Sequence, residues 1–254
     1  MKKTIIVLMA LAGVASAAVP MTLTPLSSTD DWTLGYKQYS GAKLAIDTAN
    51  QTITATTPDQ AGWGEGYGFY TLTTPIDLTE TTDTLSFSFT LTQQDSDSLA
   101  TVALVGNSQA IVMGAYYGWE SIQYGLTSKG TNDGANKTYS AGKSTWTDYY
   151  SSGTDAQGSR EDLVAIDTTN PVTVSGEIAW GTDQYVLTLT SGTTTKTLDL
   201  GTSVQLNQIS IALDGPSSVF PAVSNISVVS TPEPATATLS LLALAGLAAR
   251  RRRH

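Results

Sequence analysis

Cysteine is absent from the 254-residue chain, and histidine occurs once, as the last residue, His254. The rest of the chain therefore has no disulfide, no Ser-His-Asp or Cys-His catalytic set, and no zinc site built on histidine or cysteine. Stability must come from core burial, which 41% hydrophobic residues allow in a chain of this length. The chemistry that remains is that of carboxylates, in catalysis or in binding hard cations through oxygen.

Charged residues are few, at 14%, and basic residues are the scarcer kind, with 13 Lys and Arg against 22 Asp and Glu. Six of the basic residues stand at the two ends of the chain, so seven remain between them. Without those six basic residues the net charge is −15, or −14 if Glu233 at the C-terminal end is removed as well. We therefore expect no binding to nucleic acid or to anionic membrane surfaces, whereas a neutral glycan or a cation is compatible.

Long helical patterns are also missing, because no run keeps a 3.6-residue period between caps. Residues 85–91 instead alternate apolar and polar side chains, as a half-buried strand does. Residues 102–105 and 110–115 are continuously apolar, as expected of strands central to a sandwich. We predict an all-β fold: a single antiparallel β-sandwich of the jelly-roll kind over residues 18–230.

The other predicted strands are short runs separated by turn residues. They cover residues 32–36, 43–47, 51–56, 67–73, 172–180, 185–189, 196–200, 209–213 and 223–229. One stretch, 127–162, is rich in Gly, Ser, Asn, Asp and Thr and shows no alternation of strand length. We predict a long polar loop there, which is either functional or an insertion that holds an additional edge hairpin.

The end of the body has a recognisable order of features: a strand opened by Tyr185, a Ser-Gly turn, a partner strand, an apolar strand that runs into Leu213-Asp214-Gly215, and a closing strand. This order resembles the concanavalin A-like, laminin-G-like jelly roll. The resemblance implies that the closing strand lies beside N-terminal strands, here near residues 32–36. The family includes lectins, carbohydrate-binding modules, glucanases and adhesion modules, so it implies a fold more than a function.

Carboxylates do not follow the pattern of the glucanases of that family, which carry E-x-D-x-x-E on one strand so that alternation directs all three into the cleft. The sequence has no such motif. Glu161 and Asp162 are adjacent, so on a strand they would face opposite sides. We predict no catalytic residue and no enzyme activity; a secreted carbohydrate-active enzyme of the same fold is the alternative.

Aromatic residues gather in two polar stretches, one around Trp63, Glu65 and Tyr67, where glycines alternate with them, and one around Trp146 and Tyr149. An exposed ring can stack on the apolar face of a sugar, while a carboxylate accepts hydrogen bonds from its hydroxyls. These five residues are therefore the predicted glycan-binding residues. The alternative is that the rings belong to the core, with glycine where strands turn.

Metal ligands are harder to find. Asp95-Ser96-Asp97 and Asn132-Asp133 offer oxygen atoms, and calcium sites occur in the concanavalin A-like family. Neither spacing matches a calcium-binding loop, and the same residue types are ordinary turn residues. We predict no metal site and no cofactor, with calcium as the alternative.

The N-terminus has the order of a secretory signal: a basic start, an apolar run over residues 4–14, and a small-x-small triplet that ends at Ala17. We predict that residues 1–17 are a signal peptide cut after Ala17, and that the protein is exported. A membrane anchor is the rival interpretation, but the apolar run is short for a membrane span.

The C-terminus combines Pro232-Glu233-Pro234, an apolar stretch over residues 235–249, and the basic cluster Arg250, Arg251, Arg252 and Arg253. This order resembles the PEP-CTERM sorting signal of Gram-negative bacteria that possess an exosortase. The resemblance implies that residues 231–254 are a sorting segment and that an exosortase-type enzyme processes it. Residues 235–249 would be a transient inner-membrane helix, with the arginines held on the cytoplasmic side; a lasting anchor is the alternative.

The predicted function is that of an exported, non-enzymatic protein of the cell surface, outer membrane or extracellular matrix of a Gram-negative bacterium, with an extracellular glycan as its candidate ligand. A purely structural matrix component is an alternative that the sequence does not separate from it.

Overall fold

The computed structural model describes residues 21–36, 44–56, 66–93, 98–107, 109–115, 120–128, 161–214 and 220–231. These residues form fifteen strands and one short 3-10 helix, η1 (Pro25–Ser27), which confirms the all-β prediction. In this part of the chain no helix has the length and apolar character of a membrane span. The predicted signal peptide and sorting segment lie outside the described residues.

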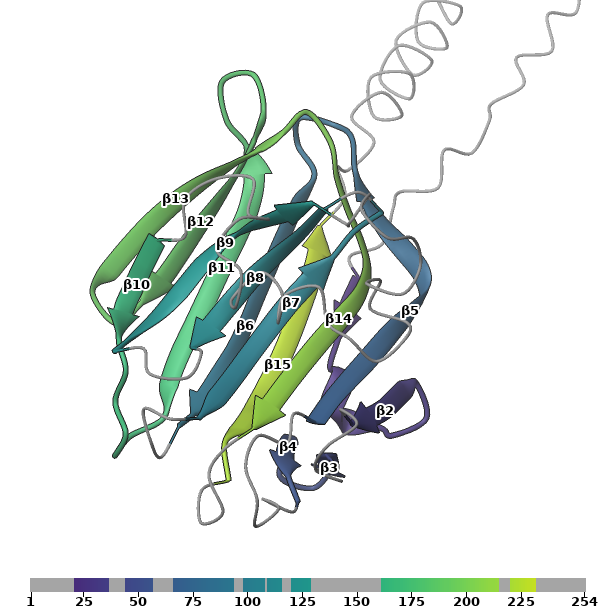
Figure 1. The fold of residues 1–254 in the computed structure, drawn as a ribbon. Helices are drawn as coiled ribbons and strands as arrows, with labels where there is room; N and C mark the ends of the chain where they lie inside the picture. Colours follow the sequence, from purple (N-terminus) through teal and green to yellow (C-terminus); the bar gives the residue numbers. More distant parts are fainter. Residues whose placement is uncertain are drawn as a thin grey trace, which may run out of the picture.

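Two antiparallel sheets pack face to face (Figure 1). The eight-stranded sheet has the order β13-β12-β11-β6-β15-β4-β3, with β1 beside β15. Its strands are β1 (Met21–Leu23), β3 (Leu44–Asp47), β4 (Thr52–Ala55), β6 (Thr84–Thr92), β11 (Val172–Trp180), β12 (Tyr185–Ser191), β13 (Thr194–Gly201) and β15 (Ala222–Thr231).

The seven-stranded sheet has the order β10-β9-β8-β7-β14-β5-β2. Its strands are β2 (Trp32–Tyr36), β5 (Gly66–Leu78), β7 (Leu99–Val105), β8 (Gln109–Ala115), β9 (Ser121–Ser128), β10 (Glu161–Ala165) and β14 (Val204–Asp214).

The core lies between the sheets, and β6 shows how the sequence builds it. Leu85, Phe87, Phe89 and Leu91 are buried in the core, whereas the Ser and Thr residues between them lie on the outer face of the sheet. This is the alternation expected of a strand that is buried on one side only. The predicted half-buried strand is therefore confirmed.

The centre of the seven-stranded sheet is buried on both faces. On β8, Ile111 and Met113 belong to the core, and Ala110 and Val112, which alternate with them, are equally inaccessible. Strand β7 shows the same pattern. The continuous apolar runs that the sequence places here are explained by this double burial, as predicted.

The N-terminal pairing differs from the prediction. β2 pairs with β5 in the seven-stranded sheet, whereas the closing strand β15 lies beside β1, β4 and β6. The indole Nε1 of buried Trp32 donates a hydrogen bond to the Pro25 carbonyl of η1, at 2.8 Å. The chain thus crosses between the sheets at η1, so the pairing expected near residues 32–36 is wrong, although β15 does return beside N-terminal strands.

The predicted polar loop is shorter than residues 127–162. β9 includes residues 127 and 128, and β10 begins at Glu161 and pairs with β9 as an edge strand. Polar residues are compatible with this exposed edge, because Glu161 accepts a hydrogen bond from the Tyr124 hydroxyl at 2.7 Å and Asp162 accepts one from Ser121. Residues 129–160 lie outside the described part.

Candidate functional site

The predicted glycan-binding residues are not brought together by the described structure. Trp63, Glu65, Trp146 and Tyr149 lie outside the described residues. The backbone of Tyr67 lies in β5, where it pairs with β2 and β14. The five remain a prediction, and the site is built below from the residues that the structure does place.

The outer face of the eight-stranded sheet is covered with hydroxyl side chains. Alternation turns the Ser and Thr residues of β6 and β11, Thr188 and Thr190 of β12, and Ser227 of β15 away from the core. The register then aligns them across strands: Ser175 of β11 lies opposite Ser88 of β6 on one side and Thr190 of β12 on the other. Ser227 of β15 also lies opposite Ser88.

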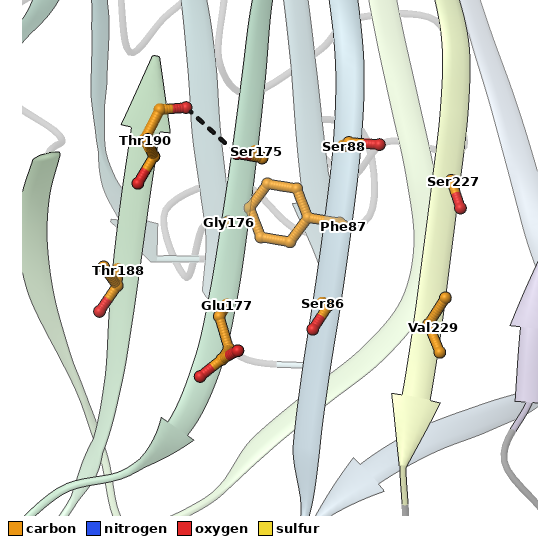
Figure 2. A pocket seen from close by; sticks show the side chains of 10 residues that line it. All are labelled: Ser86, Phe87, Ser88, Ser175, Gly176, Glu177, Thr188, Thr190, Ser227 and Val229. Atoms are coloured by element: carbon orange, nitrogen blue, oxygen red, sulfur yellow. Dashed lines mark hydrogen bonds between the residues drawn. The ribbon is translucent and has the colours of Figure 1, made fainter. Parts of the chain in front are cut away.

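The centre of this face is hollowed into a groove of about 540 Å³, a size in the range of ligand sites. Figure 2 shows it crossing β12, β11, β6 and β15. Serines occupy its two central strands, and their short side chains leave the space. The lining residues are Ser86, Phe87, Ser88, Ser175, Gly176, Glu177, Thr188, Thr190, Ser227 and Val229.

Most hydroxyls of the groove are not used by the protein itself. Ser175 Oγ donates to the Thr190 carbonyl at a long 3.4 Å, the contact drawn in Figure 2. Within the described structure, Ser86, Ser88 and Ser227 make no side-chain hydrogen bond and are partly exposed. These groups remain available as donors and acceptors for a bound molecule.

Glu177 is the one charged side chain that lines the groove. It is exposed on β11, opposite Ser86 of β6 and Thr188 of β12. None of the described residues forms an ion pair or a hydrogen bond with its carboxylate. The groove therefore combines neutral hydroxyls with a single negative charge.

A glycine supports the groove from the core side. Gly176 of β11 lies opposite Phe87 of β6, and a Cβ atom at Gly176 would come within 2.3 Å of the Phe87 ring. The missing side chain lets this ring lie against the β11 backbone, and it stacks nearly parallel to Phe89 at 6.4 Å between centroids. The central strands of the groove are thus packed tightly from behind.

A second hollow of about 860 Å³ lies between the β10–β11 connection and the β12–β13 turn. Its carboxylate, Asp167, is fully used by its own turn, since it accepts hydrogen bonds from both the backbone and side chains of Thr169 and Asn170. These bonds hold the pKa of Asp167 well below its usual range, and the bond from the Thr169 hydroxyl contributes most. The hollow therefore offers fewer free polar groups than the groove.

Asp95-Ser96-Asp97 and Asn132-Asp133, the stretches that offer oxygen atoms for calcium, lie outside the described residues. Among the described residues, no group of three or more His, Cys, Asp or Glu side chains is arranged to hold an ion. The groove also has one carboxylate, whereas glycoside hydrolysis uses two that flank the scissile bond. The groups that line the groove are six hydroxyls and one carboxylate, which can exchange hydrogen bonds with a bound molecule.

No protein-family model matches the sequence, and no curated protein matches it. Among solved structures, the chain is similar to the endo-1,3-beta-glucanase from Streptomyces sioyaensis, at 12% identity and a TM-score of 0.51, over 86% of this chain and 97% of the glucanase. It is also similar to the basic winged bean lectin crystallised with Tn-antigen, at 10% identity and a TM-score of 0.46, over 84% and 98% of the two chains. The exoplasmic/lumenal domain of VIP36, in its Ca²⁺/Man3GlcNAc-bound form, matches at 10% identity and a TM-score of 0.44, over 81% and 86%. At these identities the comparison establishes the fold alone: the body is a concanavalin A-like β-sandwich.

Proposed function

We propose that the protein is an exported, non-enzymatic glycan-binding protein of the cell surface or extracellular matrix, and that its glycan lies in the groove of the eight-stranded sheet. The observation that carries the proposal is the alignment of six hydroxyl side chains from four neighbouring strands in one groove. Sugar hydroxyls exchange hydrogen bonds with Ser and Thr in both directions, because each such group donates and accepts.

The fold gives this proposal a precedent. The glucanase that shares the sandwich acts, by its name, on a 1,3-beta-glucan. The same name also supports the alternative, a secreted carbohydrate-active enzyme. The single carboxylate of the groove favours binding over hydrolysis, since Glu177 has no acidic partner among the lining residues.

A glycan array with the purified protein tests the proposal, together with two variants of β6. Ser88→Tyr places a ring in the groove, whereas Thr92→Tyr places one on the same face of the same strand, outside the groove. Both substitutions suit a strand, so both variants should fold. We expect binding to be lost in Ser88→Tyr and kept in Thr92→Tyr. An array without any signal would refute glycan binding, and release of reducing sugar from a polysaccharide would refute the non-enzymatic assignment.

Export and sorting are part of the proposal and rest on the sequence of the two ends. An apolar segment followed by Arg250, Arg251, Arg252 and Arg253 would stop in the inner membrane with its arginines inside. Mass spectrometry of the extracellular protein tests this. We expect a form that begins after Ala17 and ends near Pro232-Glu233-Pro234; recovery of the intact chain outside the cell would contradict it.

A further inference from the structure

Glu177 gives the groove a charge, and this charge narrows the class of glycan. We propose that the groove selects glycans that carry protonated amino groups, with the Glu177 carboxylate as their counter-ion. The inference rests on the proposed glycan binding and adds to it the chemical class of the sugar.

None of the described residues neutralises the Glu177 carboxylate. Lys196 is the one basic residue among those that the structure describes, and on β13 it lies opposite Leu189, a core residue. It therefore belongs to the other face of the sheet from Glu177. With no cation of the described chain beside it, Glu177 is free to pair with a cation on a ligand.

The hydroxyls around Glu177 fit a sugar that carries that cation. Ser86 and Thr188 lie directly opposite Glu177 on the two adjacent strands. A bound amino sugar can place its ammonium group on the carboxylate while its hydroxyls bond to these side chains. Charge-assisted hydrogen bonds of this kind are about twice as strong as neutral ones. Sugars with carboxylate or sulfate groups would be repelled by Glu177 and by a chain with net charge −9.

A cationic peptide fits the groove less well than a glycan. β11 and β6 are paired on both sides, so neither offers a free edge to which a peptide strand could add. Apolar contact is also limited, since Val229 is the one aliphatic side chain that faces outward among the lining residues.

The test compares the binding of two oligosaccharides to the purified protein by titration calorimetry: a β-1,4-linked glucosamine oligomer and its N-acetylated counterpart of the same length. We expect the free-amine oligomer to bind at least about threefold more tightly, an exposed charge pair being worth up to about fivefold. This preference should disappear at about 0.5 M salt, where exposed charges are screened.

Two variants locate the effect. Glu177→Gln should remove the preference while leaving the binding of the acetylated oligomer within about twofold, which is the size of a weak exposed pair. Asp199→Asn removes the same charge from an exposed position of β13 outside the groove, so it should keep the preference.

Equal binding of the two oligomers by the unchanged protein would overturn the inference and leave glycan binding intact. A preference lost equally in both variants, or an oligolysine bound as tightly as the glucosamine oligomer, would also overturn it, since either result shows a general charge effect. A failure of the proposed function is distinct, because then no glycan of any charge would bind.

Discussion

The two sheets share one core but have different outer faces. On the eight-stranded sheet, outward residues such as Ser88 and Ser175 line an open groove. On the seven-stranded sheet, Ala103, Ser210 and Ala212 alternate with core residues in the same way, yet they are fully buried. The comparison teaches that alternation alone does not make an outer face accessible. On the open face the outward residues of β6 are all Ser and Thr, whereas the buried outward positions of the other sheet are mainly Ala and Val. The open face is the one that we propose for binding.

The largest expected effect comes from placing a charge on each face. Ala212→Asp puts a carboxylate at a fully buried outward position of β14, which should cost about 3–5 kcal/mol of unfolding free energy. Ser88→Asp adds the same group to the open groove and should change the stability by no more than about 1 kcal/mol. Urea denaturation measures both. Equal losses would show that the two outer faces do not differ as described.

A methyl group beneath the groove should have the next largest effect. Gly176→Ala forces the Phe87 ring to move and should cost about 1–3 kcal/mol, whereas Ser175→Ala beside it, on the open face, should cost no more than about 0.5 kcal/mol. Melting temperatures compare the two variants. If the clash is the cause, the penalty of Gly176→Ala shrinks in a Phe87→Leu background; an unchanged penalty would refute it.

Removal of a buried hydroxyl should change the stability by a smaller amount, and in opposite directions at two positions. Ser210 Oγ is buried without a hydrogen-bond partner, so Ser210→Ala should be neutral or stabilise by up to about 1 kcal/mol. Ser191 Oγ is also buried but donates to the Thr173 carbonyl at 2.9 Å, so Ser191→Ala should destabilise by about 1 kcal/mol. Chemical denaturation measures the stability of both variants. A larger loss of stability in Ser210→Ala than in Ser191→Ala would contradict the structure.

Alkaline pH should destabilise the protein through one buried tyrosine in each sheet. Neutral pH should have no such effect. Burial, followed by the negative charges of Asp83 and Glu80, raises the pKa of Tyr185 in β12 to about 12. Burial, followed by the hydrogen bond to Glu161, raises the pKa of Tyr124 in β9 as well. The unfolded chain has tyrosines with a pKa of about 10, so this stability is complete below about pH 10 and is lost as the pH rises toward 12.

Near-UV circular dichroism between pH 9 and 12 follows this loss. Tyr185→Phe also removes the hydrogen bond to the Glu80 carbonyl, 2.6 Å long, so the variant should be less stable at neutral pH yet lose less between pH 10 and 12. A stability that stays constant over that range in the unchanged protein would contradict the raised pKa values.

Much of the fold could be predicted because strand patterns are local. The alternation around Phe87 and Phe89 predicts a half-buried strand, and Ser191-Gly192 predicts the β12–β13 turn, where Gly192 has a φ of +57°. The partner of residues 32–36 could not be predicted in this way, because sheet membership depends on a chain crossing at η1, which no periodicity encodes. β10 could not be predicted from the sequence because it is an exposed edge strand with polar residues.

The groove could not be predicted from the sequence. Ser88, Ser175 and Ser227 are separated by 87 and 52 positions along the chain, and each alone is an ordinary outward residue of a strand. Only the register of β6 with β11 and β15 brings them together. The sequence instead indicates aromatic clusters, because residues that are close along the chain form a pattern that can be read locally. A signal was present in the repeated Ser and Thr at alternate positions of several strands, but its meaning depends on the sheet order.

Mapping the bound ligand by NMR tests the central claim most directly. The backbone amide signals of the purified protein are followed while the glycan that binds best is added. We expect the largest shifts at Ser86–Ser88 of β6 and at their neighbours on β11, β12 and β15, with little change on β7 and β8. Shifts confined to β7, β8 and β14, or spread evenly over the molecule, would contradict the claim that the eight-stranded face is the binding face.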